Sequence, residues 1–433
     1  MGDRGRLRAV LIGQGVSRDL FVLASTQSIA AFGAGLIIPL LAPLLAGLPD
    51  PFFPPAVLGI PVTTELQVGL LFSLFGIVRS VLQVPMGRLS DYVGLRKPFL
   101  EAGMLGSAAM LYAYGSVGSV TALISVRVLQ GVALAVSTPA LMAIVEGITQ
   151  RDTRGGSMGF FSTMRTLGWG LGPIVGGALV DIFSMSVAFS LGAGLTLVAV
   201  VAIRLAVPEV PPTSGPSTTP DTEIAANGAA TGGDVFWLFS SRRQASTLVG
   251  LGLALVTLMM GFSAMVAMEN PILDRIGGTK AGFGLVFAIT TLTRLVVQFP
   301  VGIASDTYGR KRFIVGGLLL SAPLVALMGF AHTLFEFVLL RGVLGVALAG
   351  VIAPAYALAA DVVDEYRSGE QMGLVTTAFS VGFAFGPLLA GGVAFLGFAV
   401  PFLLAAALTV CGGVTVWLLV EEPPKGGDRR GER

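Results

Sequence analysis

The sequence has very few of the residues that build catalytic and metal sites. It contains one cysteine and one histidine, Cys411 and His332, which excludes a disulfide framework, a cysteine or histidine metal site and a histidine-based catalytic dyad. A GxxxxGK[ST] phosphate-binding loop is also missing, so the chain has no evident ATPase of its own. Charged residues make up only 12% of the chain, against about 25% in ordinary soluble domains. We therefore expect a protein that is not an enzyme and that uses no metal or cofactor.

Most of the chain consists instead of long apolar runs. Hydrophobic residues make up 54% of the 433 residues, and a run of about 20 of them can cross a hydrocarbon layer of about 30 Å. We count twelve such runs, near residues 20–46, 66–86, 98–117, 120–145, 158–180, 185–207, 247–268, 282–303, 312–331, 335–359, 371–395 and 397–420. The predicted fold class is an all-α membrane protein with twelve transmembrane helices.

The basic residues predict how these spans are oriented. Nearly all of them lie on one side of the predicted membrane, and only Arg275 and Lys280 lie on the other. Because basic residues favour the cytoplasmic side, we expect both termini in the cytoplasm and the chain in the cell (plasma or inner) membrane. The basic residues sit at the ends of apolar runs and form no patch, so no nucleic acid partner is implied.

The composition changes between the sixth and seventh spans. Residues 208–234 are rich in Pro, Gly, Ser and Thr and have few large apolar residues, which is typical of a flexible linker. We predict an N-terminal six-helix bundle over 1–207, a cytoplasmic linker over 208–245, and a C-terminal six-helix bundle with a short cytoplasmic tail over 246–433. A second irregular segment, 49–61, is expected to be an outer loop, either a lid over the outer entrance or a stiff connector.

Two stretches of the chain repeat each other at a distance of 215 residues, 79–97 and 294–312. The matched pairs are Arg79 and Arg294, Gln83 and Gln298, Pro85 and Pro300, Gly87 and Gly302, Ser90 and Ser305, Asp91 and Asp306, Gly94 and Gly309, and Lys97 and Arg312. A long-period duplication in a very apolar chain is typical of transporters built from two equivalent halves. The repeat therefore predicts two pseudo-symmetric bundles.

The repeated stretches end in GRLSDYVGLRK (87–97) and GIASDTYGRKR (302–312). Both resemble the signature between spans 2 and 3 of the major facilitator superfamily, although the first copy has Tyr92 and Leu95 where basic residues are common. The resemblance implies an ionic latch that stabilises an outward-open arrangement, in which the basic residues meet an acid at the end of span 4 or span 10. The residues it assigns to this latch are Asp91, Arg96, Lys97, Glu146, Asp306, Lys311, Arg312 and Asp361. The alternative is ordinary interfacial charge that sets the topology.

Further motifs inside the spans resemble the twelve-span drug/proton antiporter branch of this superfamily. RVLQG (127–131) in span 4 resembles the motif linked there to proton coupling, and RGVLG (341–345) in span 10 keeps its arginine and glycine, which implies a coupling role for Arg127 and Arg341. GWGLGPIVGG (168–177) in span 5 and GAGLIIPLLAP (33–43) in span 1 resemble the glycine-proline motifs of antiporters. The alternative for all of them is close helix packing, because glycines at intervals of four residues make a smooth helix face.

Two arginines inside the spans are the sharpest candidates for a binding site. Arg79 and Arg294 each precede a motif aspartate by 12 residues, or about 18 Å of helix, which places them near the middle of the membrane. Gln83 and Gln298 follow one turn later. A cation at that depth is costly unless it faces protein or water, so such residues mark transport pathways. We expect both arginines to face one central cavity; the alternative is that they bond backbone carbonyls or neighbouring helices.

Arg165 in span 5 has no basic counterpart in the second half and is a further candidate for contact with a substrate, with packing as the alternative. Carboxylates are absent from the deep interior. Glu101 and Glu146 lie near the inner edge, and Glu65, Asp181 and Glu269 lie near the outer edge. Proton-coupled exchange usually needs a buried carboxylate, so the sequence leaves the coupling mechanism open.

These observations predict a secondary transporter that binds a small-molecule substrate between its halves and exposes it to each side in turn. The resemblance favours efflux by exchange with protons or another coupling ion, and the central arginines favour an anionic or strongly hydrogen-bonding solute. Uptake or exchange of a small anion is the rival within transport. A membrane receptor or scaffold that no longer transports would be a different class. We expect the chain to act as a monomer in the lipid bilayer.

Overall fold

The computed structural model describes residues 17–49, 55–57, 60–149, 154–209, 241–363 and 368–422. The first half contains α2 (Arg18–Leu36), α3 (Leu41–Ala46), β1 (Ala56–Val57), β2 (Ile60–Pro61), α4 (Thr64–Val93), α5 (Arg96–Tyr114), α6 (Val120–Ile148), α7 (Arg154–Ile182) and α8 (Met185–Ala206). The second half contains α10 (Arg242–Ser263), η3 (Ala264–Val266), α11 (Glu269–Ile276), α12 (Lys280–Tyr308), α13 (Arg310–Met328), α14 (Leu334–Val362), α15 (Ser368–Val393), η4 (Ala394–Leu396) and α16 (Val400–Leu419).

Local sequence signals explain where these helices begin and end. Ser and Thr side chains accept a backbone N–H at the start of several of the long helices, because an oxygen at the N-cap satisfies a donor that the helix cannot. These N-caps are Ser17, Thr63, Ser119, Ser184, Ser241, Thr279 and Thr333. Gly94 and Gly309 follow α4 and α12 with φ of 72° and 106°. This region of φ favours glycine, which explains why both copies of the repeated motif have a glycine at this turn.

The first predicted span is divided. Residues 20–46 read as one apolar run, but the α-helix ends at Leu36 and α3 begins at Leu41. Pro39 lacks the N–H that would donate to Gly35, and its ring crowds that carbonyl group. The Gly35 carbonyl instead accepts from Ile38 at 3.1 Å, a tighter turn that ends the helix.

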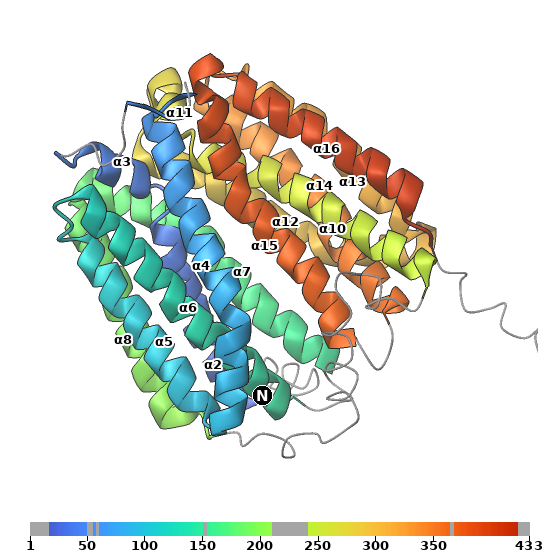
Figure 1. The fold of residues 1–433 in the computed structure, drawn as a ribbon, viewed down its shortest axis with the longest axis horizontal. Helices are drawn as coiled ribbons and strands as arrows, with labels where there is room; N and C mark the ends of the chain where they lie inside the picture. Colours follow the sequence, from blue (N-terminus) through green and yellow to red (C-terminus); the bar gives the residue numbers. More distant parts are fainter. Residues whose placement is uncertain are drawn as a thin grey trace, which may run out of the picture.

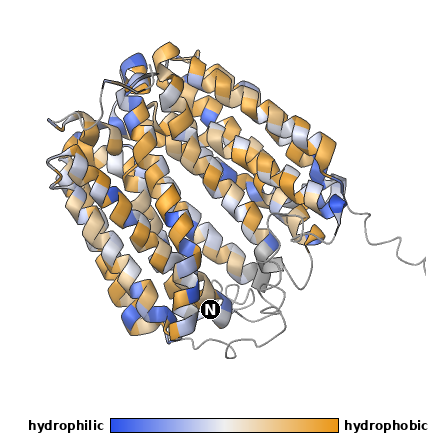
Figure 2. Ribbon diagram, viewed as in Figure 1, coloured by the Kyte–Doolittle hydropathy of each residue, from blue (hydrophilic) through white to orange (hydrophobic). Residues whose placement is uncertain are grey.

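Ten helices of the described residues are long and apolar enough to cross a membrane. In Figure 2 hydrophobic residues cover most of each helix, and hydrophilic residues concentrate near the helix ends. The remaining long helices are α5, whose first turns carry Arg96, Lys97 and Glu101, and α7, which is rich in glycine. They pack among the apolar ones, α5 against α6 and α8, and α7 against α2 and α12. The predicted all-α class of twelve spanning helices is confirmed.

The helices form two bundles that touch along two seams. Helix α7 of the first bundle packs against α12 of the second, and α4 packs against α15. We call the end of each bundle at which the described chain starts or stops, at Ser17 or Glu422, its inner end, and the opposite end its outer end. The bundles lie close together at their outer ends and diverge toward their inner ends (Figure 1).

The contacts in the α7–α12 seam and in the α4–α15 seam are equivalent, as the duplication of the sequence predicts. A Cβ atom built on Gly177 of α7 would lie 2.2 Å from the carbonyl oxygen of Lys280 on α12. A Cβ atom on Gly391 of α15 would lie 2.2 Å from the carbonyl oxygen of Glu65 on α4. Only glycine permits backbones to approach this closely. The same contact therefore occurs twice, and the bundles have a pseudo-twofold relation.

One detail of the predicted repeat is wrong. Beyond the turn the bundles correspond at a distance of 214 residues, since α5 begins at Arg96 and α13 at Arg310. The first copy holds one extra residue, Leu95, in its turn. Lys97 therefore corresponds to Lys311 in space, and the match of Lys97 with Arg312 does not hold.

The helix α10 begins at Arg242, so the last residues assigned to the linker from the sequence belong to a helix. Residues 210–240 of the predicted linker lie outside the described residues. In the predicted outer loop, β1 and β2 form a two-stranded antiparallel pair in which Val57 faces Ile60.

The glycine motif of α7 gives a test of the packing. A Cβ atom on Gly172 would lie 2.5 Å from the Phe32 carbonyl oxygen of α2, whereas nothing lies within 4 Å of one on Gly194 of α8. We expect Gly172→Leu to lower the free energy of unfolding by about 1–3 kcal/mol or to prevent folding, because overpacking forces the backbones apart. Thermal unfolding in detergent measures this, with Gly194→Leu as the control. Equal melting temperatures in the two variants would contradict the packing argument.

Candidate functional site

Three arginines from three helices meet between the bundles. Arg79 lies on α4, Arg165 on α7 and Arg294 on α12, each well inside its helix. The charge of Arg165 lies close enough to repel the guanidinium groups of both Arg79 and Arg294. Helices α4 and α7 belong to one bundle and α12 to the other, so the three side chains share the space between the bundles. We refer to Arg79, Arg165 and Arg294 as the arginine cluster.

The arginine cluster has no counter-charge within the described residues. No hydrogen bond or ion pair joins these guanidinium groups to another described residue, and the Nε atoms of Arg79 and Arg294 are buried without a partner. Arg165 is nevertheless exposed, and Arg79 and Arg294 are half-buried. One exposed and two half-buried cations that repel each other across two bundles indicate a place between the bundles that solvent can reach. The alternative that Arg79 and Arg294 bond carbonyl groups or other helices finds no support among these contacts.

Tyr356 of α14 completes the cluster. It interacts electrostatically with both Arg165 and Arg294, and it is half-buried. Sequence reasoning missed it because a single tyrosine in an apolar span is usually a packing residue, and the first half has no equivalent that would have marked it. Gln83 and Gln298 lie one helical turn from Arg79 and Arg294 and are half-buried, so they extend the polar surface toward the inner end.

Arg127 and Arg341 belong to a different kind of site. Arg127 is 2% exposed and donates to Gln130 Oε1 at 3.0 Å and to the Tyr114 hydroxyl at 3.4 Å. Its guanidinium also lies over the rings of Phe72 and Phe75. Tyr114 in turn donates to Gln130 at 2.8 Å. Arg127 thus joins α4, α5 and α6 within the first bundle, as a packing residue would.

Arg341 has the equivalent place in the second bundle and is 0% exposed. It donates to the carbonyl groups of Val286 at 3.3 Å and Phe262 at 3.2 Å. The Phe262 and Phe287 rings lie 4.6 Å and 5.5 Å from its guanidinium carbon. Its partners are therefore backbone and aromatic groups of α10 and α12. A coupling role for Arg127 and Arg341 stays a prediction.

An aromatic layer lies on the outer side of the arginine cluster. Trp169 follows Arg165 by one turn of α7, about 6 Å nearer the outer end. Its ring centroid lies 5.5 Å from those of Phe287 on α12 and Phe383 on α15, and Phe262 of α10 contacts both phenylalanines. The layer spans both bundles, so it separates the arginine cluster from the outer end. Aromatic residues are common in spans, and no sequence pattern set these four apart.

Two predicted latch residues at the inner end of the second bundle, Asp306 and Asp361, form an ion-pair network around Arg310. Its Nε donates to Asp306 at 2.8 Å, and its Nη1 donates to Asp361 and to the Ala357 carbonyl at 3.1 Å. Its backbone N–H donates to Glu422 at 2.7 Å. The cation that meets Asp361 is thus Arg310, which sequence reasoning used only for topology. In space Arg310 corresponds to Arg96, which donates to the equivalent carbonyl group in the first bundle, that of Ala143.

Two further predicted latch residues, Lys97 and Lys311, each hold one bundle together. Lys97 Nζ donates to the carbonyl groups of Arg204 at 3.0 Å and Val207 at 2.5 Å, and Lys311 Nζ donates to that of Trp417 at 2.9 Å. Each lysine therefore fastens the last helix of its bundle, α8 or α16. The inner end of α8 and of α16 is the C-terminus of the helix, where a positive charge such as that of a lysine is favourable.

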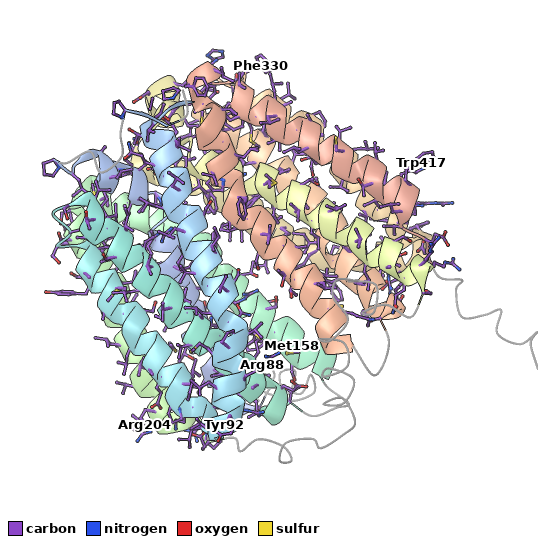
Figure 3. The ribbon with its side chains drawn as sticks, in the orientation of Figure 1. Arg88, Tyr92, Met158, Arg204, Phe330 and Trp417 are labelled. Atoms are coloured by element: carbon purple, nitrogen blue, oxygen red, sulfur yellow. The ribbon has the colours of Figure 1, made fainter. Side chains whose placement is uncertain are left out.

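Arg96 donates to the Ala143 carbonyl at 3.4 Å, one turn before Glu146, which is exposed. Arg312 is exposed on α13. The side chain of Asp91 lies outside the described residues. Arg88, Tyr92 and Arg204 lie at the same inner end of the first bundle (Figure 3).

Comparisons with known proteins agree with this architecture. The family model of the Major Facilitator Superfamily matches residues 23–268 and 249–433. The chain is 25% identical over 407 residues to the uncharacterized MFS-type transporter MJ1560 of Methanocaldococcus jannaschii, covering 94% of this chain and 99% of that protein. It is 33% identical over 176 residues to the multidrug resistance protein MdtG of Proteus mirabilis, covering 40% and 42% of the two. The crystal structure of the human organic anion transporter MFSD10 (TETRAN) has a similar fold, with a TM-score of 0.67, 20% identity, and coverage of 92% and 99%.

The network around Arg310 gives a test at the inner end. We expect Arg310→Ala to lower the free energy of unfolding by about 1.5–3 kcal/mol, because hydrogen bonds to two aspartates and a carbonyl are lost. The control is Arg312→Ala, at an exposed neighbouring residue, which should change the free energy of unfolding by less than about 0.5 kcal/mol. Chemical or thermal unfolding in detergent measures both. A larger effect at Arg312 than at Arg310 would overturn the assignment.

Proposed function

The chain belongs to the major facilitator superfamily, and on that premise we propose that it exports a small organic anion in exchange for protons. The family supports a membrane transporter with a small-molecule substrate. The proposal adds the solute, the direction and the coupling. It also places the protein in the cell membrane, with the inner ends of both bundles at the cytoplasm.

The observation that carries the proposal is the arginine cluster without a counter-charge. Three like charges in a confined space repel each other, and the repulsion grows as water is excluded. A bound carboxylate or other anion would offset this repulsion and accept charge-assisted hydrogen bonds from more than one guanidinium. Tyr356, Gln83 and Gln298 would complete the contacts as neutral donors and acceptors. In this reading Arg165 stands at the centre, and Arg79 and Arg294 grip the solute from opposite bundles.

The arrangement of the bundles supports alternating access. The outer ends are held together at the two seams, and the aromatic layer lies between the arginine cluster and the outer end. The inner ends diverge (Figure 1). A rocking of one bundle against the other about the arginine cluster would open the outer side and close the inner side. The antiporter-like motifs and the similarity to a multidrug resistance protein favour export.

A second candidate is the uptake or exchange of a small anion. The same arginine cluster favours it, because the cluster selects for charge and not for direction. The two differ in whether a proton gradient drives the flux. In proteoliposomes with an acidic exterior, an anion flux whose rate does not depend on the pH difference would favour exchange of one anion for another.

The arginine cluster can be tested by binding. We expect salicylate to raise the melting temperature of the purified protein and the cation tetraphenylphosphonium to leave it unchanged. Arg165→Gln should weaken salicylate binding about tenfold or more, because a charge-assisted hydrogen bond is lost. Arg79→Gln and Arg294→Gln should do the same.

The matched control is Arg88→Gln, an exposed arginine near the inner end of α4, which should bind salicylate like the wild type. Stabilisation by the cation alone, or unchanged salicylate affinity in all three cluster variants, would defeat the proposal.

A further inference from the structure

A buried carboxylate lies at the outer end of the second bundle. Glu269 is the first residue of α11, in the connection between α10 and α12, and its side chain is 0% exposed. No other aspartate or glutamate whose side chain the structure describes is buried. From the sequence it was placed near the outer membrane edge, where a carboxylate would normally meet water. The fold instead covers it.

The contacts of Glu269 are incomplete. Its Oε1 atom accepts from Lys280 Nζ at 3.1 Å, while its Oε2 atom is buried without a hydrogen-bond partner. Lys280 Nζ also lies 3.5 Å from Asn270 Oδ1. A carboxylate buried with one oxygen unsatisfied is costly in its charged form. A proton on Oε2 would remove the charge that makes this burial unfavourable.

The burial of Glu269 is linked to the contact between the bundles. Lys280 is the first residue of α12, and the carboxylate of Asp181 on α7 accepts from the backbone N–H groups of Lys280 at 3.2 Å and Ala281 at 2.8 Å. A negative charge at a helix N-terminus is favourable. The close approach of Gly177 to the Lys280 carbonyl lies in the same seam. Helix α3 of the first bundle also packs against α11. Parting the bundles would remove this cover and the contacts of Asp181 with the Lys280 backbone, and we expect water to reach Glu269 as a result.

The other charged groups near α11 either have partners of their own or are exposed. Arg275 donates to the Ala331 carbonyl at 2.9 Å, contacts His332 and lies over the Phe398 ring. Asp274 is exposed. Helix α3, which also packs against α11, carries no titratable side chain. Lys280 from α12 is therefore the charge that faces Glu269, with Asp181 of α7 on the far side of the same turn.

Burial raises the pKa of Glu269 to about 8, and Lys280 acts in the opposite direction without cancelling this effect. In an open, hydrated arrangement the carboxyl would return toward its ordinary pKa of about 4.3. The closed outer end therefore binds a proton that the open outer end releases, across the pH range between these two values. By linkage, acid favours the closed form and alkali favours the open form.

We propose that Glu269 is a proton-binding site that couples closure of the outer end to the acidity of the outer solution. The Glu269 carboxylate takes one proton from that solution as Asp181 docks on α12, and it returns the proton when the seam parts. The inference rests on the alternating opening of the outer end that the proposed transport requires. An acidic exterior would then drive the empty transporter from its outward-open form back to the form described above.

The distance between the outer ends tests this directly and needs no substrate. Spin labels on Gly118→Cys in the first bundle and Phe330→Cys in the second, in a Cys411→Ala background, report the separation by pulsed electron spin resonance; Phe330 lies at the outer end (Figure 3). We expect the ratio of open to closed populations to rise with pH between 5 and 8, by up to about tenfold per unit. Glu269→Gln should stay closed and lose this response. Lys280→Met should move the midpoint to higher pH.

The matched control is Asp274→Asn, which removes an exposed carboxylate from the same helix and should respond to pH like the wild type. Gly284→Leu, which places a side chain against the Pro173 backbone in the α7–α12 seam, should give the open distance at every pH and so calibrates the labels. A pH response in Glu269→Gln equal to that of the wild type, or a wild type closed throughout, would overturn the inference. Failure of salicylate binding with an intact pH response would instead refute only the proposed solute.

Discussion

Direct backbone contact at four glycines holds the two bundles together at their outer ends. Cβ atoms on Gly69, Gly177, Gly284 and Gly391 would each lie 2.1–2.4 Å from a carbonyl oxygen of the opposite bundle. Because no side chain lies between the helices at these positions, few side chains need to change conformation when the helices separate. The arginine cluster and the aromatic layer are formed by residues from both bundles, and Glu269 pairs with Lys280, whose backbone lies in one of the seams.

The arginines in the middle of the helices fall into two groups. Arg127 and Arg341 each donate hydrogen bonds to backbone or side-chain groups and lie against aromatic rings inside one bundle, so they hold helices together. The arginine cluster has no such partners among the described residues, although its members lie equally deep in their helices. The difference is one of place. The first group lies inside a bundle and the second lies between bundles, where any lasting ion pair would oppose the movement of one bundle against the other.

Much of the fold could be predicted because apolar length and duplication are properties of the sequence itself. The twelve spans and the two equivalent halves needed no tertiary information. The register of the second half was missed by one residue, because Leu95 lies in a turn whose length only the structure shows. The break at Pro39 was also missed, since the surrounding run is apolar throughout.

The site was less predictable than the fold. Arg79 and Arg294 were marked by the repeat and by their depth, but the central position of Arg165 depends on the path of α7 between α2 and α12. Tyr356 and the aromatic layer carry no pattern that distinguishes them from packing residues. The burial of Glu269 was not predicted, because position along the chain gives distance from the membrane edge, whereas burial depends on which segments fold over that edge.

The cap that Asp181 places on α12 has no counterpart across the pseudo-twofold axis, because the position 214 residues later is Phe395, in the short segment Ala394–Leu396 whose side chains are not buried. One seam thus ends in hydrogen bonds to a carboxylate, and the other ends in apolar side chains that already meet solvent. The two seams share their backbone contacts but differ in charge at the outer end. The α7–α12 seam is therefore the one whose closure can respond to the charge state of its surroundings.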